Sequence, residues 1–160
     1  MASADHPYVF AAVAQQRRQF ASLIGERRAQ APTGEIVAAL REHADQPVTS
    51  PVFGPRGPLA DILVHSGDVR IALGLPFEPD VRHATQAMDF LTGRWPIGFL
   101  PLRRLRGIRL SATDVSGSWR EGVEVTGPVA ALLMSVCGRT ASLDALAGPG
   151  STMLRRRVII

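Results

Sequence analysis

Three residues that can bind a metal or move a proton, Asp61, His65 and Asp68, lie within about two helical turns of one another. In a helix, residues four apart share a face, so the Asp61 carboxylate and the His65 imidazole can reach the same cation. Zn²⁺ accepts this combination of ligands, but a zinc site takes three or four of them. The pair can also be an ordinary helix contact worth about 0.2–0.5 kcal/mol, and the spacing leaves both interpretations open.

The stretch that carries these residues, from Pro58 to Pro76, has the signals of a single helix. Pro58 suits the first helical position, and Gly74 followed by Pro76 is a typical helix end. The apolar residues between them form a stripe wide enough to pack against neighbours on more than one side. We therefore expect a largely buried helix, whose apolar residues are Leu59, Ile62, Leu63, Val69, Ile71, Ala72 and Leu73.

The same stretch, PLADILVHSGDVRIALGLP, resembles the third-helix motif of the mycothiol-dependent maleylpyruvate isomerase family. The metal-binding domain of that family is similar to the DinB-like four-helix bundles. A second match follows, where GIRLSATDVSGSW, VEVTGPVAALLMSVCGR and LDALAG resemble the small α+β domain that ends these proteins. The matches together cover roughly residues 58–150, and the family's helix motif falls on Asp61, His65, Asp68, Arg70, Leu73 and Gly74.

The resemblance implies a metal, expected to be Zn²⁺, held by two His and one carboxylate, with a low-molecular-weight thiol as the fourth partner. His65 matches one imidazole and Asp61 the carboxylate. Asp68 either fixes the tautomer of His65 without binding the metal itself or is a plain surface carboxylate. The other His of the family belongs to an earlier Asp-x-x-x-His pattern, which this sequence lacks before Pro58. We expect the chain to begin after that helix. His43 is a candidate replacement ligand, with a surface His as the alternative.

The resemblance also implies a reaction. The thiol of mycothiol, activated by the metal, would add to an electrophilic double bond, allow rotation and leave again, or it would stay attached in a transferase. The family places an arginine near the metal to bind an anionic substrate, and Arg139 matches it. A guanidinium suits a planar carboxylate, but an Arg at a helix end also interacts favourably with the carbonyl dipole. We therefore expect either a catalytic role or a plain helix-end role for Arg139.

Two functions from different classes follow. The first is a mycothiol-dependent isomerase or S-transferase that acts on a small electrophile. The second is a non-catalytic or truncated family member that serves as a binding or interaction module. A bundle without its first helix would leave an apolar stripe exposed, which predicts a homodimer through that face.

The composition of the chain argues against several other classes of protein. The chain has 160 residues, 46% of them hydrophobic, and no apolar run approaches the roughly 18–20 residues that span a bilayer. Cys137 is the single cysteine, so it cannot form an intramolecular disulfide, and its apolar helix predicts that it is buried and packs in the core. The absence of a disulfide fits a reducing compartment, so we expect a cytoplasmic protein. All 18 basic residues are Arg; three of them cluster at 103–106 and three at 155–157, and the chain has few aromatic residues. We expect solvated basic faces, no nucleic-acid partner and no membrane partner.

The order of elements predicts a mainly α protein with a small α+β part. Residues 1–100 would form an incomplete, DinB-like helical bundle and residues 101–160 a small α+β domain. Helices are expected over 7–29, 33–44, 58–73 and 77–93, with Thr33 as an N-cap and a proline-rich loop over 46–57. Strands are expected over 108–112, 118–120 and 123–126, and helices over 127–136 and 142–147.

Overall fold

The computed structural model describes residues 30–46, 54–93, 99–101 and 103–159. The chain divides into two compact units, Met1–Pro47 and Val48–Ile160, and each is considered by itself. The helix expected over residues 7–29 and most of the loop over 46–57 lie outside the described residues. The domain boundary expected after residue 100 stays a prediction.

The described part of the first unit is one helix, α2 (Thr33–His43), where the sequence predicted a helix to residue 44. Thr33 is not its N-cap. That position belongs to Pro32, whose extended backbone, with ψ of 138°, lets its carbonyl accept from the amides of Glu35 and Ile36. No residue of α2 is buried.

The second unit begins with α3 (Arg56–Ala72), two residues earlier than expected. Pro58 still falls in the first turn, where an N–H has no helical partner to lose. The end of α3 was predicted correctly, because Gly74 adopts a φ of +68° that favours glycine. There the Gly74 amide donates to the Ile71 carbonyl and the Leu75 amide to the Arg70 carbonyl, the two hydrogen bonds of a Schellman motif.

The prediction that α3 is largely buried was wrong. Its inner face is narrow and consists mainly of small residues, with Ala60, Val64 and Gly67 buried against α4 and α5. Gly67 lies so close to α5 that a Cβ there would be 2.6 Å from the Met134 sulfur. The apolar stripe is wider than this contact surface, so part of it is exposed: Ile62 by 64%, Val69 by 59% and Leu73 by 68%.

Helix α4 (Val81–Thr92) begins at Asp80, whose carboxylate accepts from the amides of Arg82 and His83. The spacing of apolar residues in this stretch predicts that Val81, Ala84, Met88 and Leu91 face inward. Of these, Ala84, Met88 and Leu91 are buried, together with Ala87. The predicted inward position of Val81 was wrong, since Val81 is exposed in the first turn. Phe90 is half-buried against the core, and His83 is exposed.

Three short strands follow, β1 (Ile108–Ala112), β2 (Ser118–Trp119) and β3 (Val123–Gly127), in the order β2-β1-β3. β1 is antiparallel to β2 and parallel to β3. The chain therefore crosses the start of β1 between β2 and β3, and Gly122 makes this crossing with its backbone against Gly107. Ile108 and Leu110 alternate with polar residues in the sequence, which predicts a half-buried strand, and in β1 both are buried while Arg109 is exposed.

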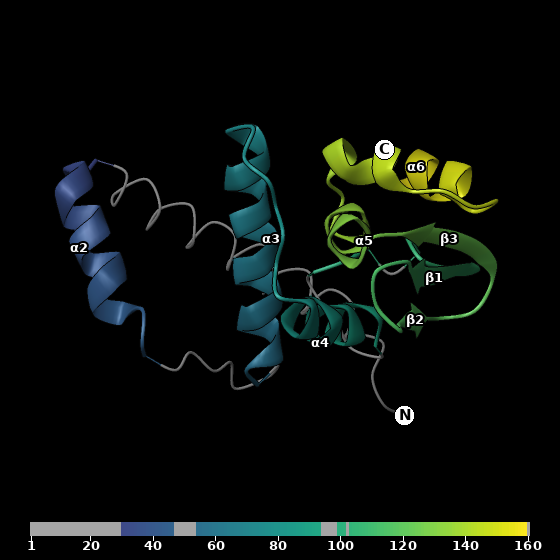
Figure 1. The fold of residues 1–160 in the computed structure, drawn as a ribbon, viewed down its shortest axis with the longest axis horizontal. Coiled ribbons are helices and arrows are strands. Elements are labelled where there is room, and N and C mark those ends of the chain that lie inside the picture. Colours follow the sequence, from purple (N-terminus) through teal and green to yellow (C-terminus); the bar gives the residue numbers. More distant parts are fainter. Residues whose placement is uncertain (1–29, 47–53, 94–98, 102, 160) are drawn as a thin grey trace, which may run out of the picture. The chain divides into compact units, whose positions relative to one another are not determined.

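The chain ends with α5 (Val129–Val136), the 3₁₀ helix η1 (Thr140–Ala145) and α6 (Ser151–Val158) (Figure 1). α5 contacts α3, α4 and both β1 and β3, and nearly all of its residues are buried. The helix expected over 142–147 occurs earlier as η1, because Ala147 instead pairs with Thr126 beside β3. The sequence did not predict α6, which packs on β3 and η1.

The described residues thus confirm a mainly α fold with a small α+β part. Their buried apolar side chains form a core shared by α3, α4, α5, α6 and the sheet. Among the residues described, no helix combines the length and the hydrophobicity that crossing a membrane requires.

Because the chain crosses close to Gly107 between β2 and β3, the same substitution at two neighbouring glycines should lower the free energy of unfolding by different amounts. Gly122→Ala places a methyl group 2.1 Å from the Gly107 backbone at a φ of +139°, so we expect a loss of about 2–4 kcal/mol in unfolding free energy. Gly107→Ala, with a φ of +68° and open space, serves as the control and should cost about 1 kcal/mol. Urea unfolding measures both, and equal losses would contradict the close backbone approach.

Candidate functional site

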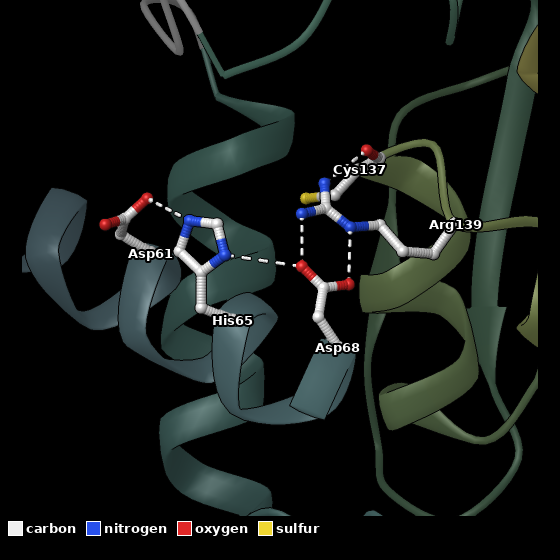
Figure 2. Close-up of polar contacts among 5 residues, drawn as sticks. All are labelled: Asp61, His65, Asp68, Cys137 and Arg139. Carbon is white, nitrogen blue, oxygen red and sulfur yellow. Dashed lines mark hydrogen bonds and ion pairs between the residues drawn. The ribbon is translucent and has the colours of Figure 1, made fainter. Parts of the chain in front are cut away.

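Helix α3 places the three polar residues of the sequence motif in one row (Figure 2). The His65 imidazole lies between the two carboxylates, with Nε2 3.5 Å from Asp61 Oδ1 and Nδ1 3.3 Å from Asp68 Oδ2. The side chains of His65 and Asp61 are 63% and 62% exposed. The i,i+4 pair expected from the sequence is therefore formed, on an open face of the helix.

The two carboxylates face opposite nitrogens of the ring, so the three side chains do not converge on one point. Within the described ranges, no three or more His, Cys, Asp or Glu side chains are grouped so as to hold a metal ion. His43, the candidate replacement ligand, is at the end of α2, where its Nδ1 lies 2.8 Å from the Ala39 carbonyl of its own helix.

Arg139 contacts the same row from a distant part of the sequence. Its Nε and Nη2 donate to the two oxygens of Asp68, at 2.9 and 2.6 Å, in the two-pronged geometry that guanidinium and carboxylate groups favour. Both side chains are about one-third exposed. The hydrogen bonds from Arg139 hold the pKa of Asp68 below its usual value, and the same bonds raise the pKa of Arg139. Asp68 is therefore no plain surface carboxylate.

Arg139 also makes the helix-end contact that the sequence offered as its alternative role. Helix α5 ends in a second Schellman motif, in which the amides of Gly138 and Arg139 donate to the carbonyls of Ser135 and Met134. The Cys137 carbonyl accepts from Arg139 Nη1 at 2.8 Å. The guanidinium thus joins the end of α5 to Asp68 of α3.

Arg104 satisfies the preceding carbonyl of α5, a role that the sequence did not predict. Its Nη1 donates to the Val136 carbonyl at 3.1 Å, close to Gly138. Burial lowers the pKa of Arg104, and the positive charge of Arg139 lowers it further. Nothing in the sequence distinguishes Arg104 from the exposed Arg103 beside it.

Cys137 lies beside these arginines but is not a reactive thiolate. Its side chain is half-buried and packs against the core. Burial raises the pKa of the Cys137 thiol to about 11, although the nearby charges of Arg139 and Arg104 act in the opposite direction. The thiol is therefore protonated at neutral pH, in keeping with a packing role.

A surface hollow of about 470 Å³ lies between α3 and the residues that follow α5. Asp68 and Arg139 are polar groups in its wall, and much of the remainder is apolar. Three of the five guanidinium N–H bonds of Arg139 are used by Asp68 and Cys137, which leaves one on each Nη. The hollow can therefore accept a small ligand with an apolar body and an anionic group; its wall consists of Asp68, Ile71, Ala72, Met134, Gly138, Arg139, Thr140 and Ala141.

No protein-family model matches the chain, and comparisons with curated proteins and with solved structures give no match. The relation to the maleylpyruvate isomerase family therefore stays a hypothesis that depends on the sequence motifs and on the geometry described above.

The Asp68–Arg139 ion pair predicts a pH-dependent contribution to stability. Because the folded pKa of Asp68 is lowered, this contribution is complete above the unfolded pKa near 4 and is lost as pH falls through the folded value. Asp68→Asn should cost about 1 kcal/mol at pH 7, a modest value because both groups are partly exposed. Urea unfolding of both proteins should give a smaller difference at pH 3 than at pH 7.

Asp61→Asn is the matched control for that experiment, since Asp61 is on the same helix but mostly exposed. Its effect should stay within about 0.5 kcal/mol at either pH. A loss from Asp68→Asn that is the same at pH 3 and pH 7 would show that the charge of Asp68 does not stabilise the fold.

The state of Cys137 is checked by alkylation. At pH 8 a thiol with a pKa of about 11 should react with iodoacetamide about a hundredfold more slowly than the same thiol in the unfolded chain. Mass spectrometry follows the reaction, because the protein has one Cys. Equal rates with and without 8 M urea would mean that the native thiol is accessible and ionised.

Proposed function

We propose that the protein is a metal-dependent thiol enzyme of the maleylpyruvate isomerase type, which uses mycothiol as the thiol cosubstrate. The observation that carries this proposal is the His65 imidazole between two carboxylates, one of them held by Arg139 at the edge of a hollow. An imidazole oriented by a carboxylate is a common arrangement around protein-bound metals.

His65 and Asp61 are the residues that would hold the metal, and their nitrogen and oxygen donors fit Zn²⁺. Nε2 of His65 and Oδ1 of Asp61 lie 3.5 Å apart on the open face of α3, so both side chains would be available to hold the same ion. Two donors are fewer than a catalytic zinc requires, so a further protein ligand must come from outside the described residues or from a partner chain. When bound, the metal supplies the positive charge that lowers the pKa of a thiol beside it.

Asp68 would position both partners of the site. Its Oδ2 faces Nδ1 of His65, which favours the tautomer with a proton on Nδ1 and leaves the Nε2 lone pair directed toward Asp61. The same oxygen accepts from Arg139 Nη2 at 2.6 Å. A change at Asp68 would therefore disturb the imidazole and the guanidinium together.

Arg139 would bind the anionic end of the electrophilic substrate through its two remaining N–H bonds. The apolar wall of the hollow, which includes Ile71 and Met134, suits the carbon skeleton. Addition of the thiolate would form a C–S bond and move the double-bond electron pair onto the electron-withdrawing group of the substrate, which permits rotation. Cleavage of the C–S bond would then restore the double bond and complete an isomerisation. Uptake of a proton from solvent by the adduct would instead give the product of an S-transferase. We place this activity in the cytoplasm, in line with a single Cys that remains a thiol.

A second candidate function is a non-catalytic binding module that associates through α3. The exposed Ile62, Val69 and Leu73 favour it, because apolar residues on one helix face commonly mark a contact surface. On this alternative the protein forms a homodimer and His65 makes no contribution to metal binding.

Metal content of the purified chain tests the proposal. After dialysis against a weak chelator, we expect near-stoichiometric zinc in the wild type and at least a tenfold loss in His65→Ala, measured by plasma mass spectrometry. His83→Ala is the matched control, since His83 is also exposed on a helix and lies 3.8 Å from the carboxylate of Asp80. It should retain the wild-type zinc content.

Zinc that is absent from the wild type, or that is unaffected by His65→Ala, would contradict the metal site. A dimer in sedimentation equilibrium that is lost on Val69→Ser, together with absent zinc, would favour the binding module. If zinc is retained through His65, consumption of mycothiol with small unsaturated carboxylic acids then identifies the reaction.

A further inference from the structure

Two arginine-rich stretches that are far apart in the sequence meet in the fold. One is the turn of residues 103–107 before β1, and the other is the end of α6. The Arg157 guanidinium donates through Nη1 to the carbonyls of Arg104 and Arg106, at 3.0 and 2.6 Å. These contacts hold the backbone of the turn against the end of α6, which carries Arg155, Arg156 and Arg157.

The joined stretches carry no acidic residue, since residues 101–113 and 145–160 contain no Asp or Glu. Arg155 is neutralised by Asp144 at 2.6 Å, and Arg104 points inward to α5. The side chains of Arg103, Arg106 and Arg156 are exposed, and none of them forms a hydrogen bond or ion pair with another described residue. We call these three residues, together with the half-buried Arg157, the arginine patch.

An exposed aliphatic side chain lies directly beside this patch. Ile159 follows Arg157 and Val158 at the end of α6 and is 64% exposed. Neither stretch contains an aromatic residue on which a nucleic-acid base could stack. Basic groups beside an exposed aliphatic side chain are the combination found in proteins that lie on anionic membranes, where the arginines meet phosphates and the aliphatic group enters the interface.

The sequence predicted no membrane partner because it does not reveal that the two stretches meet. From this arrangement we propose that the arginine patch and Ile159 bind the surface of a membrane that contains anionic phospholipids. The guanidinium groups would bind headgroup phosphates, for which their planar fork is well suited, and Ile159 would insert among the lipid glycerol and acyl groups. This surface is formed by different residues from those of the candidate metal site, so it does not depend on the proposed reaction.

Vesicle co-sedimentation of the full chain tests the proposal. We expect binding to vesicles of phosphatidylcholine with 30% phosphatidylglycerol, weak binding to phosphatidylcholine alone, and a decrease when NaCl is raised from 50 to 300 mM. The triple variant Arg103→Gln, Arg106→Gln, Arg156→Gln should bind about a hundredfold more weakly, since each arginine near such a surface contributes about fivefold.

A matched variant separates the patch from net charge alone. Arg41→Gln, Arg82→Gln, Arg109→Gln also removes three exposed arginines and so gives the same total charge. It should bind as the wild type does. Ile159→Ser should weaken vesicle binding severalfold but leave binding to a 20-base-pair DNA duplex unchanged, because only the lipid interface accepts the aliphatic group.

Three outcomes would overturn the proposal. Equal losses in the two triple variants would mean that net charge alone draws the protein to the vesicles. Patch-dependent binding to the DNA duplex without binding to vesicles would assign the patch to nucleic acid. Absence of binding to anionic vesicles at 50 mM NaCl, with an unchanged circular dichroism spectrum, would leave the patch as a solvated surface.

Discussion

The described fold depends on the burial of α5, a helix of eight residues that contacts α3, α4 and the sheet. Its apolar side chains supply much of the core, but burial also removes the backbone groups at its ends from water. Other segments must therefore supply their partners. The Asp114 carboxylate accepts from the Val129 amide at the start of α5, while Arg104 and Arg139 donate to carbonyls at its end.

The candidate site is a consequence of that requirement. Arg139 stays near the end of α5 because the Schellman turn at Gly138 and the Cys137 carbonyl fix it there. Because this guanidinium is partly buried, a nearby negative charge stabilises it, and Asp68 on the adjacent helix α3 provides that charge. Asp68 in turn faces His65. The same chain of contacts that joins α3 to α5 thus orients the only imidazole with carboxylates on both sides in the described part of the chain.

Local signals in the sequence were sufficient for several elements. The end of α3 could be predicted because Gly74, followed by Pro76, is a typical helix end, and Gly74 adopts the positive φ that favours glycine. The pattern of β1 was also clear, since Ile108 and Leu110 alternate with polar residues. The Asp61–His65 pair followed from helical spacing alone. Each of these features is determined by residues close together in the sequence.

Features that depend on distant contacts could not be predicted. Asp68 and Arg139 are 71 residues apart, and spacing carries no information about such a pair. Helix α6 was missed because its two buried residues, Leu154 and Val158, are separated by three successive arginines and form no clear apolar pattern. The burial of α3 was overestimated, because the sequence shows how wide the apolar stripe is but not how much of it is covered by neighbouring elements. Thr33 shows the same limit at a helix start, where the preceding proline took the cap position.

In the second unit, some contacts join residues that are close in the sequence and others join residues that are far apart. This difference suggests an order in which the contacts form during folding. β1 pairs with β2 and β3 within a stretch of twenty residues, 108–127, so the sheet requires only short loops to close. The contacts of α3 with Arg139 and of α6 with the turn at residues 104–106 close loops of 71 and 51–53 residues. Because long loops close at a greater entropic cost, the sheet can form early as a template. On this ground we expect the contact between α3 and Arg139, and with it the candidate site, to form after the sheet.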